Sequence, residues 1–297
     1  MPGNSQAGTD MKDKTIVVTG ANTGIGFETA LGLAKQGARV IIVARSRDKS
    51  EATVARIQKL SSNEEVESYV FDLSSQKQIR TGCAEILKRH RQIDVLINNA
   101  GTWFSKLILT EDGIEMQMAV HHVAPFLMTH LLLPALNVSD DARVITVNSD
   151  AHFHGKIHFE DLNLTHHYHG LRSYAQSKLA NVMFTYEFER RKPKKNPAIH
   201  AVQPGLVKTD IGLKHTNPIH ALAWKVRRLG GVSAAKGAAT SIFLAMSEEG
   251  KIRSGLYWDK CKPKPSSLES YNTEDAARLW ELTEKICGIK DYFNPSL

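Results

Sequence analysis

The sequence predicts a single α/β domain built on a doubly wound parallel sheet with helices on both faces. Short runs of β-branched and aliphatic residues alternate with longer amphipathic segments from residue 14 onward. This alternation is typical of parallel strands joined by helices. Hydrophobic residues make up 42% of the 297 positions, enough for a packed core, and no Pro-, Gly- or Ser-rich linker divides the chain.

In the first half of the chain, three strand–helix units lead to a fourth strand. The apolar runs predict strands at 14–20, 39–45, 66–73 and 93–101. The segments with helical spacing of apolar residues predict helices at 26–38, 49–61 and 78–90. Gly37 is a suitable C-terminal stop for the first helix.

The second half continues the alternation. Strands are expected at 142–149, 199–205 and 255–259, and helices at 173–191 and around 126–136 and 237–245. The polar residues 1–12 are expected to form a disordered tail. The domain would then span 13–297, with a substrate lid around 210–233 whose apolar residues recur at roughly helical spacing. An ordinary packed helix is the alternative for that lid.

Composition limits the classes of function. Three cysteines without short spacing do not suggest a disulfide framework or a thiolate zinc site, so a reducing, cytoplasmic compartment fits best. The net charge is +7, but basic residues are scattered apart from 190–195, and we expect no nucleic-acid partner. No apolar run approaches the ~18 residues of a membrane span. Lys225, Arg227 and Arg228 leave a membrane-surface contact as a disfavoured alternative.

A glycine-rich turn joins the first strand to the first helix. Its glycines are Gly20, Gly24 and Gly26, which is not the commonest dinucleotide-binding spacing. They can still allow a tight turn, a close approach of a pyrophosphate to the backbone, and close packing of helix on sheet. The N–H groups of the helix N-terminus would face the phosphates. The sequence therefore favours a dinucleotide site over a purely structural turn.

The end of the second strand indicates which dinucleotide. An NAD-binding protein usually carries an acid there, whereas this chain has Arg45, with Arg47 and Lys49 close by. A guanidinium can bind the 2′-phosphate of NADP(H) in a bidentate manner. We therefore expect NADP(H), with NAD(H) the less favoured cofactor. The alternative is that these are ordinary solvated charges.

Ser149, Tyr174 and Lys178 form a candidate proton-transfer set. Tyr174 and Lys178 are four residues apart on an expected helix, hence on one face. A nearby ammonium stabilises the phenolate and lowers a tyrosine pKa from its usual value of about 10. Six histidines lie between Ser149 and Tyr174, at 152, 154, 158, 166, 167 and 169. No pair has the His-x-x-x-His helix spacing together with the glutamate of a zinc hydrolase, so we expect no metal site.

Five motifs in order make the chain resemble the short-chain dehydrogenase/reductase family over about residues 14–280. They are TGANTGIG, NNAG at 98–101, Ser149, YAQSK at 174–178 and PGLVKTD at 204–210. Finer features resemble its branch of retinol dehydrogenases and the WW-domain-containing oxidoreductase. The resemblance implies a Rossmann-type fold, with Tyr174 as acid/base, Lys178 as the group that lowers its pKa, and Ser149 as the group that positions the substrate carbonyl or hydroxyl.

The resemblance also implies a set of cofactor contacts. Asp72 would contact the adenine, and the residues from Pro204 onward would close over the nicotinamide side. Together with Arg45, the expected cofactor-binding residues are Gly20, Asn22, Thr23, Gly24, Ile25, Gly26, Asp72, Leu73, Asn99, Ala100, Gly101, Tyr174, Lys178, Pro204, Gly205, Val207 and Thr209.

One position departs from the family pattern. His121 stands where the family usually has an asparagine, in a stretch that implies a break in helical hydrogen bonding, and Pro125 follows where it should kink the helix. The carbonyl of His121 would be freed because proline has no N–H. An imidazole can also bind a water and pass a proton, so His121 joins the expected catalytic residues.

The best reading is an NADP(H)-dependent oxidoreductase acting on a carbonyl or alcohol group of a small hydrophobic substrate. A catalytically weak NADPH sensor or interaction protein is the alternative, because His121 puts the usual proton relay in doubt. A metal-dependent hydrolase is the least favoured reading. The resemblance also implies a homodimer or homotetramer without fixing which.

Overall fold

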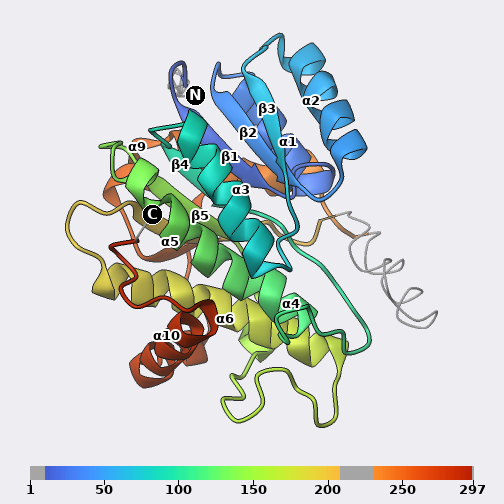
Figure 1. The fold of residues 1–297 in the computed structure, drawn as a ribbon, viewed down its shortest axis with the longest axis vertical. Coiled ribbons are helices and arrows are strands. Elements are labelled where there is room, and N and C mark those ends of the chain that lie inside the picture. Colours follow the sequence, from blue (N-terminus) through green and yellow to red (C-terminus); the bar gives the residue numbers. More distant parts are fainter. Residues whose placement is uncertain (1–10, 208–229, 296–297) are drawn as a thin grey trace, which may run out of the picture.

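One eight-stranded sheet runs through the computed structural model, which describes residues 11–207 and 230–295 (Figure 1). Its strand order is β3-β2-β1-β4-β5-β6-β7-β8. The strands are β1 (Thr15–Thr19), β2 (Arg39–Ala44), β3 (Val66–Val70), β4 (Val95–Asn98), β5 (Arg143–Val147), β6 (Ala198–Gln203), β7 (Leu256–Asp259) and β8 (Lys262–Pro263). All neighbouring pairs are parallel except β7 with β8. The predicted doubly wound parallel sheet is confirmed.

The strand order reverses between β1 and β4. The chain builds outward from β1 to β3, then crosses back to place β4 on the other side of β1. In open α/β sheets, ligands bind beyond the carboxyl ends of the strands at such a reversal. The glycine turn follows β1 directly, so it lies at this position.

Helices cover both faces of the sheet. On one face lie α1 (Gly24–Ala34), α2 (Arg47–Ser61) and α8 (Ala234–Met246); on the other lie α3 (Gln76–Arg89), α5 (Ala124–Leu136) and α6 (Gly170–Arg191), seen in front of the sheet in Figure 1. The short helix α9 (Glu248–Ile252) and the longer α10 (Thr273–Cys287) complete the C-terminal part.

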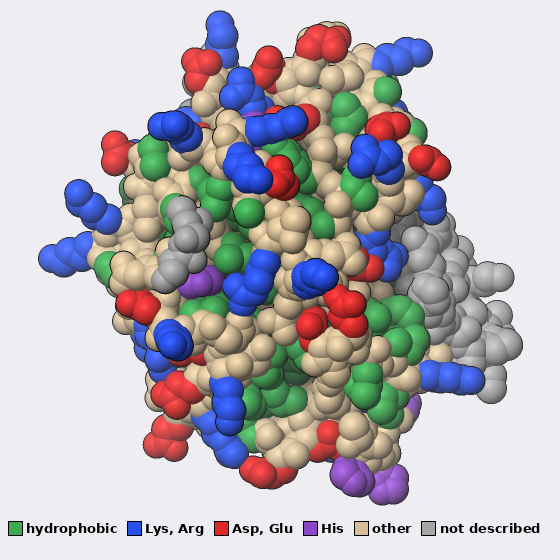
Figure 2. All heavy atoms as spheres, viewed as in Figure 1, with side chains coloured by type: hydrophobic (Ala, Val, Ile, Leu, Met, Phe, Trp, Pro, Cys, Tyr) green, Lys and Arg blue, Asp and Glu red, His purple; other side chains and the backbone are tan. Residues whose placement is uncertain are grey.

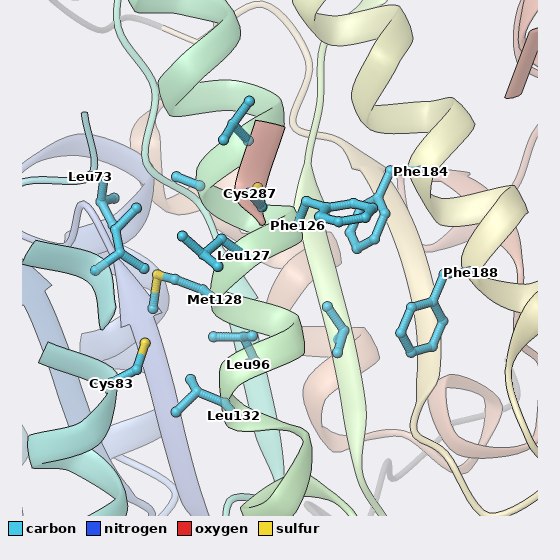
Figure 3. Close-up of a cluster of buried hydrophobic side chains, with 14 of the residues drawn as sticks. Leu73, Cys83, Leu96, Phe126, Leu127, Met128, Leu132, Phe184, Phe188 and Cys287 are labelled. Atoms are coloured by element: carbon cyan, nitrogen blue, oxygen red, sulfur yellow. The ribbon is translucent and has the colours of Figure 1, made fainter. Parts of the chain in front are cut away.

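Alternating side chains of the strands supply two cores. In β1, Val17 packs with the α3, α5 and α6 side, whereas Ile16 and Val18 pack with the α1 side. The first core holds Leu96, Phe126 of α5, and Phe184 and Phe188 of α6, all drawn in Figure 3. The central strands are buried on both faces and mostly apolar, which explains why they could be located from the sequence, whereas the edge strand β3 is only partly buried.

A long helix at residues 116–136 is interrupted by a turn of π-helix. It consists of α4 (Met116–Met118), the π-turn η1 (Ala119–Val123) and α5. The Ala124 N–H donates to the Ala119 carbonyl, five residues back. Pro125 has no N–H for the His121 carbonyl, which favours this wider turn where a kink was expected. The helix is long and apolar enough to cross a membrane, but 83% of its most apolar window is buried inside the protein.

Several buried histidines are held by hydrogen bonds within the cores. His122 Nε2 lies 2.9 Å from Thr283 Oγ1 of α10, and His200 Nε2 lies 2.9 Å from the Gly250 carbonyl. Burial lowers the pKa of His122 to about 3 and that of His200 to about 4. Both imidazoles are therefore neutral in the folded protein.

Basic and acidic side chains are interspersed over the surface drawn in Figure 2.

The structure corrects some predicted boundaries. Met11 is only 4% exposed and packs on the α1-side core, so the ordered chain begins before the predicted residue 13. The strand predicted at 66–73 ends at Val70. The antiparallel β8 and helix α10 were not predicted. Residues 1–10 and most of the predicted lid, 208–229, lie outside the described residues.

Candidate active site

The residues of the glycine turn pack so closely against the neighbouring backbone that side chains would not fit there. Gly20 and Gly24 have φ values of +67° and +61°, which favour glycine. A Cβ on Gly26 would lie 2.4 Å from the Gly20 carbonyl oxygen and 2.3 Å from Asn99 Nδ2. The glycines therefore let α1 begin against the strand ends, as the sequence predicted.

A loop at residues 99–102, after β4, is tied to this turn. Thr19 Oγ1 accepts hydrogen bonds of 3.0 Å from the N–H groups of Asn99 and Ala100. Asn99 Nδ2 donates to the Thr19 carbonyl at 2.8 Å. The structure thus brings the predicted residues Asn99 and Ala100 beside Gly20. The contribution of Thr19 was missed, although a hydroxyl at a strand end next to a glycine turn could have indicated it.

The N-terminus of α1 suits an anionic ligand. Thr23 occupies the N-cap position, but its side chain makes no capping hydrogen bond, and the first turn of α1, which includes Ile25, holds no acidic residue. Asn22 Oδ1 is buried without a hydrogen-bond partner among the described residues. Uncapped N–H groups and an acceptor for a hydroxyl are what the phosphates and ribose of a dinucleotide require.

Other predicted cofactor residues surround the same edge of the sheet. Arg45 follows β2 and is exposed. Asp72 follows β3, where its Oδ1 accepts 2.9 Å hydrogen bonds from the N–H and hydroxyl of Ser74. Leu73 points into the core. After β6, the remaining predicted residues are Pro204, Gly205 with φ +81°, and the buried Val207; Thr209 lies outside the described residues.

Ser149 begins the short 3-10 turn η2 (Asp150–His154) after β5. Its Oγ accepts a 3.2 Å hydrogen bond from the Ala151 N–H. The buried His152 holds this turn, because its Nδ1 lies 2.8 Å from the Ser149 carbonyl and its Nε2 accepts from the Ser267 N–H at 3.1 Å. The turn η2, which follows Ser149, packs on α6, the helix that carries Tyr174.

Tyr174 and Lys178 lie one turn apart on α6. The Lys178 ammonium is 5.8 Å from the centre of the Tyr174 ring and donates to the Val147 carbonyl at 3.0 Å. Burial lowers the pKa of Lys178 to about 7. Tyr174 is half-buried, with Trp103 tilted against it at 5.9 Å between ring centres. Trp103 was not predicted, and no sequence pattern identified it.

His121 is not placed as a solvent-facing proton carrier. It is 1% exposed, and burial, followed by the positive charge of Lys178, holds its pKa well below 6.5. Its Nε2 accepts from the Thr102 N–H at 2.9 Å, and its Nδ1 lies 2.8 Å from Ser177 Oγ. Both nitrogens are engaged by the protein, so the expected exchange of protons with water through this side chain does not fit the geometry.

The remaining histidines of the 152–169 segment have separate surroundings. His158 lies 3.0 Å from the Arg172 guanidinium, and His166 pairs with Asp161 at 3.1 Å on the surface. Within residues 11–207 and 230–295, no three His, Cys, Asp or Glu side chains are grouped so that they could hold a metal ion.

Comparison with known proteins places the chain in a family. The model of the short chain dehydrogenase family matches residues 14–218. Human retinol dehydrogenase 13 is 40% identical over 284 residues, which cover 93% of this chain and 85% of that protein. The protein belongs to the short-chain dehydrogenase/reductase family of oxidoreductases, and within it resembles the retinol dehydrogenases.

Solved structures agree on the fold. The crystal structure of an uncharacterized protein from Mycobacterium paratuberculosis superimposes with a TM-score of 0.75 at 31% identity, covering 96% of this chain and 97% of that one. A short chain dehydrogenase from Shigella flexneri, solved in complex with NADP, has a TM-score of 0.68 at 20% identity and covers 86% of this chain and 100% of its own.

Proposed function

We propose that this oxidoreductase uses NADP(H) to interconvert a carbonyl and an alcohol group on a hydrophobic substrate, with Tyr174 as acid/base. The observation that carries the proposal is the grouping of Tyr174 and Lys178 on α6, beside the turn that begins at Ser149. The glycine turn and the uncapped α1 N-terminus support dinucleotide binding. The exposed Arg45, with no acid at the end of β2, supports the 2′-phosphorylated form.

The protein residues have three tasks in this proposal. The bound nicotinamide supplies or accepts the hydride. Tyr174 donates a proton to the substrate oxygen in reduction and removes it in oxidation, Ser149 holds that oxygen by a hydrogen bond, and Lys178 stabilises the phenolate. Burial lowers the pKa of Lys178 to about 7, so this amine holds its proton less firmly than an exposed lysine does.

Apolar side chains next to the site residues support a hydrophobic substrate. Phe153 lies in η2 and is 40% exposed, and Leu171, three residues before Tyr174, is 52% exposed. Leu206 follows the Pro204–Gly205 pair and is 36% exposed. The name of the retinol dehydrogenase relatives points to an extended apolar alcohol or aldehyde of the retinoid type. We propose that class as the first to test.

The test is a panel of aldehydes and alcohols, including retinaldehyde and small polar carbonyls, followed by NADPH absorbance. Tyr174→Phe should lower turnover roughly 10²–10⁴-fold and keep NADPH binding, because only the proton donor is lost. Tyr186→Phe, on the same helix with its hydroxyl 2.7 Å from Ser266 Oγ, is the matched control. Tyr174→Phe turning over at the wild-type rate would refute the mechanism. A wild type that binds NADPH but reduces nothing would favour a sensor.

A further inference from the structure

The buried histidine at the π-turn joins two parts of the site that are far apart in sequence. His121 contacts Thr102, next to the predicted cofactor residues Asn99 to Gly101, through one nitrogen. It contacts Ser177, between Tyr174 and Lys178 in sequence, through the other. The imidazole and the Tyr174 ring also form a T-shaped pair, with 5.2 Å between ring centres at an angle of 85°.

The partners of the imidazole fix its protonation state. The Thr102 backbone N–H can only donate, so His121 Nε2 must be the unprotonated acceptor. A neutral imidazole then carries its proton on Nδ1, which donates to Ser177 Oγ. Ser177 in turn donates its hydroxyl hydrogen to the Tyr174 carbonyl at 2.8 Å. All the donors and acceptors in this chain of three hydrogen bonds are therefore matched.

We infer that His121 is a positioning residue that couples the cofactor-binding 99–102 loop to the tyrosine of α6. The His121 link, meaning Thr102 N–H, His121, Ser177 and the Tyr174 carbonyl, holds the loop from one end and the catalytic helix from the other. This inference rests on the proposed function, because it assigns one end to cofactor binding and the other to the acid/base.

Charge reinforces the neutral state of the link. The Lys178 ammonium and the burial of the ring both disfavour a protonated imidazole. Protonation would place an N–H against the Thr102 N–H and break the loop contact. The link therefore persists throughout the neutral pH range.

Two amide substitutions can separate the two ends. The side-chain amide of Asn reaches the place of Nδ1, so His121→Asn can keep the Ser177 contact and lose Thr102. The amide oxygen of Gln reaches the place of Nε2, so His121→Gln can keep Thr102 and lose Ser177. His121→Phe keeps the ring shape and loses both. Leaving a buried polar partner unsatisfied corresponds to roughly 5- to 150-fold in an equilibrium or rate.

The experiment measures the dissociation constants of NADPH and NADH by nucleotide fluorescence, and kcat by NADPH absorbance on a substrate from the panel. His121→Phe should weaken cofactor binding and lower kcat, each by about tenfold or more. His121→Asn should change cofactor binding more than kcat, and His121→Gln should do the reverse. Ser177→Ala should lower kcat in the wild type and add little in the His121→Phe background, because the two residues act through one path.

His122→Phe is the matched control. His122 is the next residue, is equally buried, and bonds to Thr283 of α10 rather than to the site. His122→Phe should change the melting temperature, but it should not change cofactor affinity and kcat by different factors. If His121→Phe binds cofactor and turns over like the wild type, or behaves like His122→Phe, the link has no positioning role. If the wild type reduces no substrate of the panel, the proposed chemistry fails. The cofactor affinities of the variants still test whether the contact between His121 and Thr102 supports cofactor binding.

Discussion

The glycine turn after β1 and the π-turn around His121 hold the same 99–102 loop in opposite ways. At the glycine turn, the loop can approach because glycine has no side chain: a Cβ at Gly20 would lie 2.8 Å from Ala100 Cα. At the π-turn, a side chain holds the loop, because the acceptor nitrogen of His121 faces the Thr102 N–H. The difference teaches that the first support fails when any side chain is added, whereas the second depends on which donors and acceptors the side chain offers.

The largest effect is expected at the glycine turn. Gly26→Ala places its Cβ against a backbone carbonyl and the Asn99 amide, neither of which can move without displacing α1 or the loop. NADPH affinity should fall on the order of 100-fold, the upper range for overpacking. Gly32→Ala in the same helix is the control, because its Cβ meets only the mobile end of Ile242. Equal nucleotide affinities in these two variants would show that the turn is not a cofactor support.

A smaller effect is expected at Arg45. This substitution tests whether the site beside the glycine turn prefers NADPH to NADH. Losing a charge-assisted hydrogen bond to a 2′-phosphate should cost about 1.5–3 kcal/mol, roughly 10- to 150-fold in NADPH affinity. NADH affinity should hardly change in Arg45→Ala. Arg39→Ala is the matched control, since Arg39 lies at the other end of β2 and pairs with Glu65 at 2.8 Å. A wild type that binds both nucleotides equally would remove the case for NADP(H).

The smallest effect is expected at Pro125, which tests whether the π-turn needs its proline. Pro125→Ala restores an N–H that the His121 carbonyl could accept in a regular helix. The side-chain contacts of His121 and the packing of α5 should keep the π-turn in place. We expect kcat to change by less than about tenfold and the melting temperature by a few degrees at most. A loss of kcat as large as that of His121→Phe would show that the free carbonyl, rather than the imidazole, carries the role of this turn.

The sequence was most informative where each residue's own chemistry sets the local structure. Buried apolar strands, the glycines with positive φ, and the Tyr174–Lys178 spacing could all be recognised, because conformation or spacing alone restricts the residue type. His121 was recognised as a departure, but the sequence did not show that its ring is buried with both nitrogens engaged. Its two partners lie 19 and 56 residues away, and only tertiary packing brings their N–H and hydroxyl to the imidazole.

Other features could not be predicted from the sequence because they depend on contacts between distant residues or on very short segments. Thr19 acts through backbone N–H groups that belong to a loop 80 residues later. Trp103 meets Tyr174 across the sheet edge, and a single tryptophan after the NNAG motif gives no indication of its neighbour. The antiparallel β8 has two residues, too few for an alternating pattern to appear.

The buried histidines also determine how the protein exchanges protons with its surroundings when it unfolds. In the unfolded chain a histidine takes up a proton below about pH 6.5, whereas His121, His122 and His200 have folded pKa values well below that, about 3 for His122 and about 4 for His200. Unfolding therefore takes up protons in the window from about pH 6.5 down to about 4, and stability decreases as the pH falls through it.

As the pH falls, proton uptake by these three residues in the unfolded chain should lower the stability of the fold. Urea unfolding at several pH values measures the proton uptake, and His122→Phe should lower it by about one proton near pH 5. An unchanged uptake would contradict the neutral state of His122. His121 thus belongs to a set of buried neutral imidazoles, and the protonation of these residues in the unfolded chain weakens the fold in acid.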